Sequence, residues 1–322
     1  MLGIYPNIRM PLSYRHAFIR KLIEWKPDVI HSQCEAFSMQ FAKRISKITG
    51  APIVHTYHTM YEQYISYILP GKKFASWLVR KIVQHRLKNV KLVIVPTSKI
   101  EKSFKEYGLK MPVKVIPSGI SLEQHKERIT TEVRQKMRAE LKISGTQTVL
   151  INLGRLGMEK NLDELLIFFE KAYSADNKLI FLIVGDGPAK KQLEKKAHSL
   201  GVGACVIFTG MIEPENVQKY YQLGDVFVSA STSETQGLTY IEAAANGLPL
   251  ICRQDPCLEN VIIHGENGFE YVSEKEFLEA ISIVCNNPTW KLKAGKKSEE
   301  IASCFDKNTF GNEVEKVYMS IL

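Results

Sequence analysis

Several features that would place a protein in a secreted, membrane-spanning or metal-dependent class are missing from this sequence. The six cysteines are scattered and form no Cys-x-x-Cys pair, which indicates reduced thiols of a cytosolic protein and not a disulfide framework. No apolar run approaches the ~20 residues of a membrane-spanning helix, and the N-terminus lacks the apolar core of a signal peptide. Asp-x-Asp occurs nowhere and the histidines are not clustered, so no metal ligands are obvious.

The composition is that of a folded protein with two dissimilar halves. Hydrophobic residues make up 45% and charged residues 24% of the 322 residues, which argues against disorder. At about 150 residues per domain, the length predicts two domains. Residues 1–120 hold 20 Lys and Arg against 6 Asp and Glu, whereas residues 121–322 hold 23 against 28. The first half is therefore strongly basic and the second mildly acidic.

Strand and helix patterns alternate along both halves. In the second half, apolar strands are expected at 148–153, 179–184, 205–209, 226–230 and 250–252. Continuous apolar strands between helices predict a parallel sheet covered on both faces, as in a doubly wound α/β domain. In the first half the strands expected are 29–32, 53–58, 92–96 and 113–116, with helices near 14–25, 36–49, 61–88 and 98–107.

The pattern predicts the domain boundaries. We expect a first domain at 1–121, an interdomain linker at 122–145, a second domain at 146–305, and a C-terminal helix at 306–322 that packs back on the first domain. The chain opens with prolines and a helix where an α/β domain usually has a strand and a Gly-rich loop. We therefore expect the first domain to lack its first units.

The strongest motif is the segment 233–242, which follows a buried strand and opens a helix. Gly237 lets the backbone approach a ligand, and the helix N-terminus offers N–H groups to an anion. The carboxylates of Glu234 and Glu242 can accept hydrogen bonds from sugar hydroxyls. Alternatively, Thr239 and Glu242 have the spacing of a capping box, and Glu234 is a solvated loop residue.

A second motif, Gly154-Arg155 followed by Lys160, also comes directly after a strand. A bidentate arginine and a lysine beside a Gly-containing turn suit a diphosphate, although two ordinary surface cations would give the same pattern. The glycines at 185 and 187 do not form a dinucleotide fingerprint, because Lys190 occupies the third glycine position. We interpret them as a tight loop that abuts a ligand.

Two features of the first half could serve function or only structure. His58 ends a strand and either faces a cleft between the domains or is a structural histidine with its hydrogen bonds satisfied. The basic segment 71–88 predicts a helix with Phe74, Trp77, Leu78 and Ile82 on one face, and suits either an anionic membrane surface or an ordinary core helix. Its candidate membrane or acceptor contacts are Lys72, Lys73, Trp77, Arg80 and Lys81. No nucleic-acid-binding motif accompanies these charges.

The motifs together resemble the retaining glycosyltransferases of family 4, which have the GT-B fold. The resemblance rests on Gly154-Arg155 with Lys160, the Gly-Asp-Gly-Pro turn at 185–188, and the two glutamates at 234 and 242. PDVIHSQ at 27–33, HTYHTMYEQY at 55–64, IPSGISLEQH at 116–125 and ETQGLTYIEAAANGLP at 234–249 look like the diacylglycerol glucosyltransferase subgroup. The resemblance implies two Rossmann-like, doubly wound domains with a cleft between them.

The resemblance also implies an activity: transfer of a hexose, glucose, from a UDP-sugar to a lipid such as 1,2-diacylglycerol, with retention. Arg155 and Lys160 would stabilise the leaving diphosphate, Glu234 the sugar hydroxyls and Glu242 the ribose, while His58 would reach the transferred sugar. The implied nucleotide-sugar contacts are Gly154, Gly185, Gly187, Met211, Ile212, Thr235, Gln236, Gly237, Leu238 and Glu242.

The same resemblance implies no metal or other cofactor, and a cytoplasmic enzyme held peripherally on the inner face of the cell membrane. Two alternatives stay open at this point. The acceptor could be a cell-wall or soluble molecule, or the chain could be a catalytically impaired fragment that binds a nucleotide sugar.

Overall fold

The computed structural model describes residues 17–35, 37–60 and 72–322, which divide into two compact units. Unit 1 comprises the described residues up to Pro117 together with 311–322, and unit 2 comprises 118–310. The last helix, α14 (Lys307–Ile321), therefore begins in unit 2 and ends in unit 1. The segment expected to be a linker contains α6 (Leu122–Lys126) and α7 (Thr131–Glu140), and both belong to unit 2.

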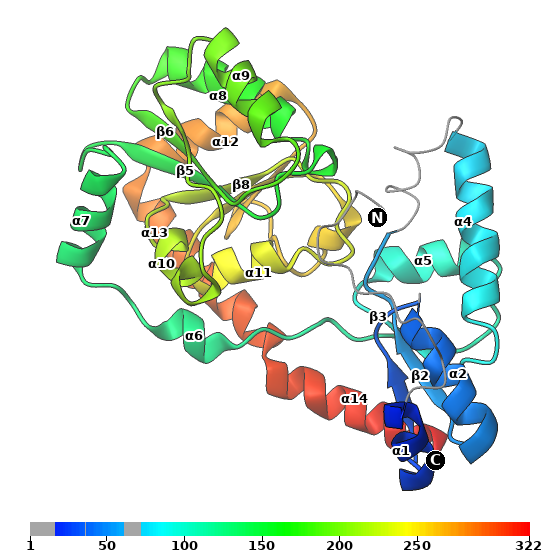
Figure 1. Cartoon of the computed structure of the whole chain (residues 1–322). Coiled ribbons are helices and arrows are strands. Elements are labelled where there is room, and N and C mark those ends of the chain that lie inside the picture. The colour runs from blue at the N-terminus through cyan, green and yellow to red at the C-terminus, as the bar shows by residue number, and fades with distance from the viewer. Residues whose placement is uncertain (1–16, 36, 61–71) are drawn as a thin grey trace. The chain divides into compact units, whose positions relative to one another are not determined.

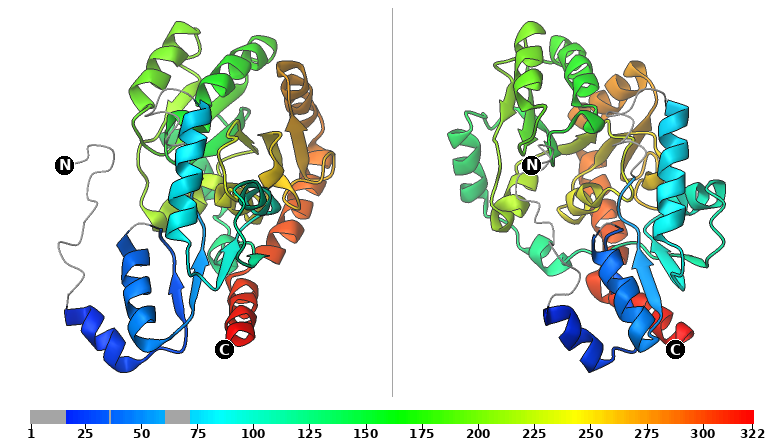
Figure 2. Two further views of the ribbon diagram at one scale, coloured as in Figure 1. Left: turned by 90° about the vertical axis from the view of Figure 1, so that its right-hand side faces the viewer. Right: turned by 45° about the vertical axis from the view of Figure 1, so that its right-hand side comes forward.

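Unit 1 is built on a four-stranded parallel sheet in the order β1-β2-β3-β4. The strands are β1 (Ile30–Ser32), β2 (Ile53–Thr56), β3 (Leu92–Val95) and β4 (Val113–Val115). The helices that alternate with them are α1 (Ala17–Trp25), α2 (Phe37–Thr49), α4 (Lys72–Arg86) and α5 (Ser98–Glu106). Helices α1 and α2 lie side by side, as Figure 2 shows. These positions agree with the predicted strands, and the part of the expected helix at 61–71 lies outside the described residues.

Unit 2 contains a six-stranded parallel sheet in the order β10-β9-β8-β5-β6-β7. The strands are β5 (Thr148–Leu153), β6 (Leu179–Val184), β7 (Val206–Phe208), β8 (Val226–Ser229), β9 (Leu250–Arg253) and β10 (Gly268–Tyr271). Five of them lie where the apolar runs predict, whereas β10, the edge strand, was not predicted. Every residue of β6 is buried, because helices cover both faces of the sheet.

The helices of unit 2 form the two outer layers. One face carries α8 (Leu162–Ala175), α9 (Lys190–Ser199) and α12 (Glu274–Asn286), and the other carries α10 (Val217–Tyr221), α11 (Leu238–Ala245) and α13 (Pro288–Ala302) (Figure 1). Helix α8 buries an apolar stripe at the i, i+3, i+4 spacing of one helix face: Leu162, Leu165, Leu166, Phe169 and Ala172. Asn287 caps α13, its Oδ1 accepting from the Trp290 amide at 2.9 Å.

Candidate functional site

The connectivity of unit 2 creates a topological switch point at the carboxyl ends of β5 and β8. From β5 the chain continues to β6 and β7 on one side of the sheet, then returns to β8, β9 and β10 on the other. Such a reversal separates the loops that follow the two neighbouring strands, and open α/β sheets bind ligands there. The loops concerned are 154–161 and 230–237. They carry the two motifs that the sequence analysis selected for a diphosphate and a sugar.

Close backbone contact fixes the loop after β5 against the loop after β6. The Leu156 amide donates to the Asp186 carbonyl at 2.9 Å. A Cβ on Gly185 would collide with the Gly154 carbonyl, and a Cβ on Gly187 would lie 2.5 Å from the Leu156 carbonyl oxygen. Glycine is therefore required at 185 and 187 for the two loops to approach, whether or not a ligand lies beside them.

The loop after β5 is also joined to the loop after β8. The Lys160 Nζ lies 2.6 Å from the Glu234 Oε1, and the Ser233 hydroxyl donates to the Glu159 carbonyl at 3.1 Å. The side chains of Lys160 and Glu234 are 28% and 16% exposed, so both can be reached from solvent. The residue predicted to bind the diphosphate, Lys160, and the residue predicted to bind the sugar, Glu234, are thus in contact at the switch point.

Arg155 is paired with a residue that the sequence analysis did not select. Its guanidinium forms an ion pair with the Glu159 carboxylate four residues further along the chain. The Glu159 side chain is only 8% exposed, whereas that of Arg155 is 38% exposed. An acid at that spacing from an arginine is common on protein surfaces, and nothing in the sequence indicates that its carboxylate is buried.

Helix α11 begins directly after Gly237, which has a φ of 75°. The aromatic ring of Tyr240 lies against the Gly237 α-carbon, and its hydroxyl is 3.0 Å from the Ser229 hydroxyl. Because the helix starts at Leu238, Thr239 lies inside its first turn and does not cap it. The alternative of a Thr239–Glu242 capping box is therefore wrong, which leaves Glu242 available for another role.

Glu242 is partly buried beside a fully buried tyrosine. The Tyr221 hydroxyl donates to the Glu242 Oε2 at 2.8 Å. Burial raises the pKa of Glu242 above its ordinary value, and the hydrogen bond from Tyr221 opposes that rise. Burial and the neighbouring Glu242 charge raise the pKa of Tyr221. This arrangement places the Glu242 oxygens in the second turn of α11, where they can accept hydrogen bonds.

The other residues predicted to contact the nucleotide sugar differ in their exposure and in their hydrogen-bond partners. The Gln236 side chain is buried, and its amide binds Ser118 twice, accepting from the backbone N–H at 2.8 Å and donating to the carbonyl at 2.9 Å. Thr235 is half-buried and Leu238 is exposed. Met211, 82% exposed, and the half-buried Ile212 follow β7 at the same edge of the sheet. Gln236 therefore anchors the start of unit 2 with both ends of its amide.

In unit 1, His58 is the exposed end of a chain of polar side chains. Its Nε2 lies 2.7 Å from the Gln33 Oε1, and the Gln33 Nε2 lies 3.1 Å from the His31 Nε2. The His31 Nδ1 reaches the Tyr318 hydroxyl of α14 at 2.6 Å. Burial, together with His55 and His58, lowers the pKa of His31 to about 4. Although part of the His58 side chain is exposed, partial desolvation of its ring, together with His55, lowers its pKa against the opposing effect of Glu35, so both imidazoles are neutral at pH 7.

Helix α4 of unit 1 buries a different face from the one that the sequence analysis selected. Val79, Val83 and Leu87 are buried, whereas Trp77 is 53% and Ile82 is 44% exposed. Of the predicted stripe, Trp77 and Ile82 face outward, Leu78 is half-buried, and the Phe74 side chain lies outside the described part of the chain. The core face was missed because its valines sit among basic residues. Lys81 is exposed.

Arg80, another of the expected membrane contacts, has a structural partner. Its Nε donates to the Tyr107 carbonyl at 2.9 Å, at the end of α5, and the Gln84 amide donates to the same carbonyl at 2.6 Å. Lys72 and Lys73 begin α4, but their side chains lie outside the described part of the chain. Of the five expected contacts, Trp77, Arg80 and Lys81 are exposed, and Arg80 is also tied to the fold by its hydrogen bond to Tyr107.

Within the described residues there is neither a group of side chains suited to a metal ion nor a helix suited to cross a membrane. Across 17–35, 37–60 and 72–322, no three His, Cys, Asp or Glu side chains are grouped so that they could hold a metal ion. No helix in that part of the chain is both long and apolar enough to cross a membrane.

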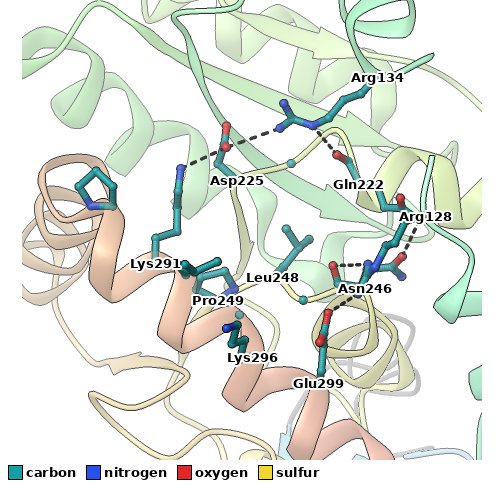
Figure 3. Close-up of a pocket in the computed structure, with 15 residues that line it drawn as sticks. Arg128, Arg134, Gln222, Asp225, Asn246, Leu248, Pro249, Lys291, Lys296 and Glu299 are labelled. Atoms are coloured by element: carbon teal, nitrogen blue, oxygen red, sulfur yellow. Dashed lines mark hydrogen bonds and ion pairs between the residues drawn. The ribbon is translucent and has the colours of Figure 1, made fainter. Parts of the chain in front are cut away.

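A pocket of about 610 Å³ lies at the amino-terminal ends of the strands of unit 2, where β8 and β9 begin (Figure 3). It contains none of the predicted site residues. Several of its charged side chains have partners within the fold: Asp225 binds Lys291 at 3.2 Å, and Arg128 donates to the Asn246 carbonyl at 2.8 Å and pairs with Glu299. We assign this pocket no catalytic role.

Comparison with known proteins gives matches along nearly the whole chain. Residues 133–301 match the family model for glycosyl transferases group 1, and residues 1–124 match that for glycosyltransferase family 4. An alpha-monoglucosyldiacylglycerol synthase from Streptococcus pneumoniae is 33% identical over 93% of this chain and 68% of its own length. The synthase of the same name from Acholeplasma laidlawii is 30% identical over 95% of this chain and 78% of its own length.

Solved structures support the fold class. HepE from Anabaena in complex with UDP-glucose has a TM-score of 0.78 at 20% identity, covering 97% of this chain and 84% of that one. Sucrose-phosphate synthase from Thermosynechococcus elongatus has a TM-score of 0.77 at 20% identity, covering 99% and 82%. The predicted fold class, two Rossmann-like α/β units of the GT-B type, is confirmed.

Proposed function

Because the chain belongs to the group 1 glycosyltransferases and is related to glucosyldiacylglycerol synthases, we propose that it transfers glucose from UDP-glucose to 1,2-diacylglycerol with retention. The observation that carries the proposal is that Arg155 and Lys160 lie on one of the two loops that flank the switch point of unit 2, and that Lys160 pairs there with Glu234 of the other loop. The similarity to the two bacterial alpha-monoglucosyldiacylglycerol synthases supports the lipid acceptor, and the UDP-glucose complex of HepE supports the donor.

In the proposed reaction the two cations carry the charge that develops on the leaving group. Arg155 donates in a fork and Lys160 acts as a point charge, which together replace the role that a metal plays elsewhere. Glu234 and the backbone at Gly237 and Leu238 hold the sugar hydroxyls. The bond from the anomeric carbon to the diphosphate breaks as the acceptor oxygen bonds on the same face, and the leaving phosphate takes the acceptor's proton.

The remaining assignments follow the same proposal. Glu242 accepts from the ribose diol, the backbone around Met211 and Ile212 meets the base, and His58 of unit 1 contacts the transferred sugar. No metal or other cofactor enters the proposed reaction. The enzyme works on the cytoplasmic face of the membrane, where a basic helix of unit 1 meets anionic lipid head groups.

One assay tests the activity. Radiolabelled UDP-glucose and diacylglycerol in mixed micelles should give a labelled glycolipid with retained anomeric configuration. Label in a soluble or cell-wall acceptor in place of the lipid would move the proposal to another acceptor. Binding of UDP-glucose without transfer to any acceptor would favour a non-catalytic nucleotide-sugar-binding protein.

The hydrogen bond from Tyr221 to Glu242 gives a pH-dependent test of the ribose contact. Protonation removes the carboxylate acceptor, so UDP binding should weaken as pH falls through the raised pKa of Glu242. Tyr221→Phe removes the bond that favours the charged form, so the pKa rises further and the weakening begins at a higher pH.

The measurement is the Kd for UDP from about pH 5 to pH 8. We expect Tyr221→Phe to weaken binding relative to the wild type by about three- to tenfold in the pH interval between the two Glu242 pKa values, the order of one typical net hydrogen bond. Tyr220→Phe, which alters a neighbouring hydroxyl that is not bonded to Glu242, is the control. Identical pH profiles for the two variants would contradict the ribose assignment.

The exposed face of α4 gives a test of membrane contact. Trp77→Ser combined with Lys81→Gln removes an amphipathic ring and one charge, and each lysine near an anionic surface contributes about 1 kcal/mol. We expect binding to vesicles rich in anionic lipid to fall by about tenfold or more, and wild-type binding to weaken with salt. Ile48→Ser, an equally exposed apolar residue on α2, is the control. Unchanged vesicle binding would remove α4 from the membrane surface.

A further inference from the structure

The charged groups on the two loops at the switch point neutralise one another. Lys160 pairs with Glu234 at 2.6 Å, and Arg155 pairs with Glu159. A diphosphate that binds there has to draw both cations away from carboxylates that already hold them. Glu234 then has sugar hydroxyls to bind, whereas Glu159 has no such second task in the proposed reaction.

The fold holds the Glu159 carboxylate beside Arg155. The side chain is 8% exposed, and the Ser233 hydroxyl fixes its backbone carbonyl at 3.1 Å. A Cβ added at Gly157 would collide with the Glu159 carboxylate. The backbone at Gly157 has φ −104° and ψ 158°, an extended conformation that any residue adopts, so the absence of a side chain at 157 leaves room for the carboxylate and is not needed by the backbone.

We propose that Glu159 is a built-in counter-ion of Arg155 that competes with the donor's diphosphate and thereby sets the affinity of this site for nucleoside diphosphates. The inference rests on the proposed function only in assigning Arg155 to the diphosphate. Like charges within one site repel, so the Glu159 carboxylate opposes the phosphate charges while it holds their arginine. Because the product UDP uses the same cations as the donor, a waiting counter-ion also shortens the time that UDP stays bound.

The first test removes the charge and keeps the shape. Glutamine is isosteric with glutamate and its Oε1 still accepts from Arg155, so Glu159→Gln leaves the arginine in place. We expect the Kd for UDP, measured by calorimetric titration, to fall by about five- to tenfold at low ionic strength. The difference should shrink as salt is added, since the site is partly exposed and screened. The matched control is Glu299→Gln, which neutralises the Arg128–Glu299 ion pair at the opposite edge of the same sheet and should leave UDP binding unchanged.

The second test moves the carboxylate without changing any charge. Gly157→Ala is compatible with the backbone but occupies the space of the Glu159 carboxylate, which must turn away from Arg155. We expect this variant also to bind UDP more tightly, by about two- to fivefold, and to add nothing once Glu159 is already glutamine. It keeps the inference testable if Glu159→Gln does not fold.

The outcomes separate this inference from the function on which it rests. Tighter UDP binding by both variants, with Glu299→Gln unchanged, supports the counter-ion. If the wild type binds UDP and Glu159→Gln leaves that affinity unchanged, Glu159 has no effect on binding and the inference is overturned. If Glu159→Gln weakens UDP binding, Glu159 positions Arg155 for the diphosphate, and the inference is overturned as well. A wild-type chain that does not bind UDP overturns the proposed donor, and the counter-ion with it.

Discussion

Replacing Lys160 by alanine should lower kcat by about 10²–10³, the loss seen when one donor to a developing negative charge is removed. The ammonium lies 2.6 Å from Glu234 at the switch point, where the proposed reaction breaks the bond to the diphosphate. Since the charge develops mainly in the transition state, kcat should fall more than the affinity for UDP-glucose.

The control for this variant is Lys297→Ala. Lys297 is 30% exposed against 28% for Lys160, and it is paired with Glu300 on α13. Lys297→Ala should leave kcat within about twofold of the wild-type value, because substitutions on the surface away from a functional site have small effects. A Lys160→Ala enzyme that binds UDP-glucose and turns over at the wild-type rate would end the proposed role of this lysine.

Asp225→Ala should destabilise unit 2 by about 3–5 kcal/mol, the cost of removing one partner from a buried ion pair. Its carboxylate accepts from Arg138 at 3.0 Å and from the Val149 amide at 2.9 Å, and Lys291 lies 3.2 Å away (Figure 3). Arg138 is 5% exposed, and burial lowers the pKa of its guanidinium while Asp225 raises it. Without Asp225 the buried guanidinium loses its counter-charge.

Urea unfolding measures this loss. Glu123→Ala, which breaks an ion pair with Lys307 in which both side chains are at least half exposed, should cost no more than about 1 kcal/mol. Arg138→Met in the Asp225→Ala background should recover part of the stability, because it removes the charge left without its partner. If Asp225→Ala were as stable as Glu123→Ala, the buried ion pair would carry none of the stability assigned to it.

The strands of unit 2 could be predicted because their signal is local. The runs at 148–153 and 179–184 are apolar without interruption, as strands covered on both faces must be, and β5 and β6 have those bounds. Helix α7 could not be predicted in the same way. Its ten residues are largely polar, and an ion pair from Arg138 to Asp225, 87 residues along the chain, anchors it.

The candidate site shows the same division between local and distant information. The motifs around Arg155, Lys160 and Glu234 are contiguous, so their order along the chain was enough to select them. Three other facts depend on partners that only folding brings close. These are the hydrogen bonds between Gln236 and Ser118, the hydrogen bond from Tyr221 to Glu242, and the burial of the Glu159 side chain.

The division of α14 between the two units has a consequence for synthesis on the ribosome. Unit 2 is one continuous stretch, 118–310, whereas unit 1 needs residues 311–322, including Tyr318, whose hydroxyl meets His31 across 287 positions of sequence. All residues of unit 2 therefore leave the ribosome before the segment 311–322, whereas unit 1, although its strands are made first, lacks that segment until it emerges. During that interval the strands of unit 1 are exposed to aggregation and to chaperones.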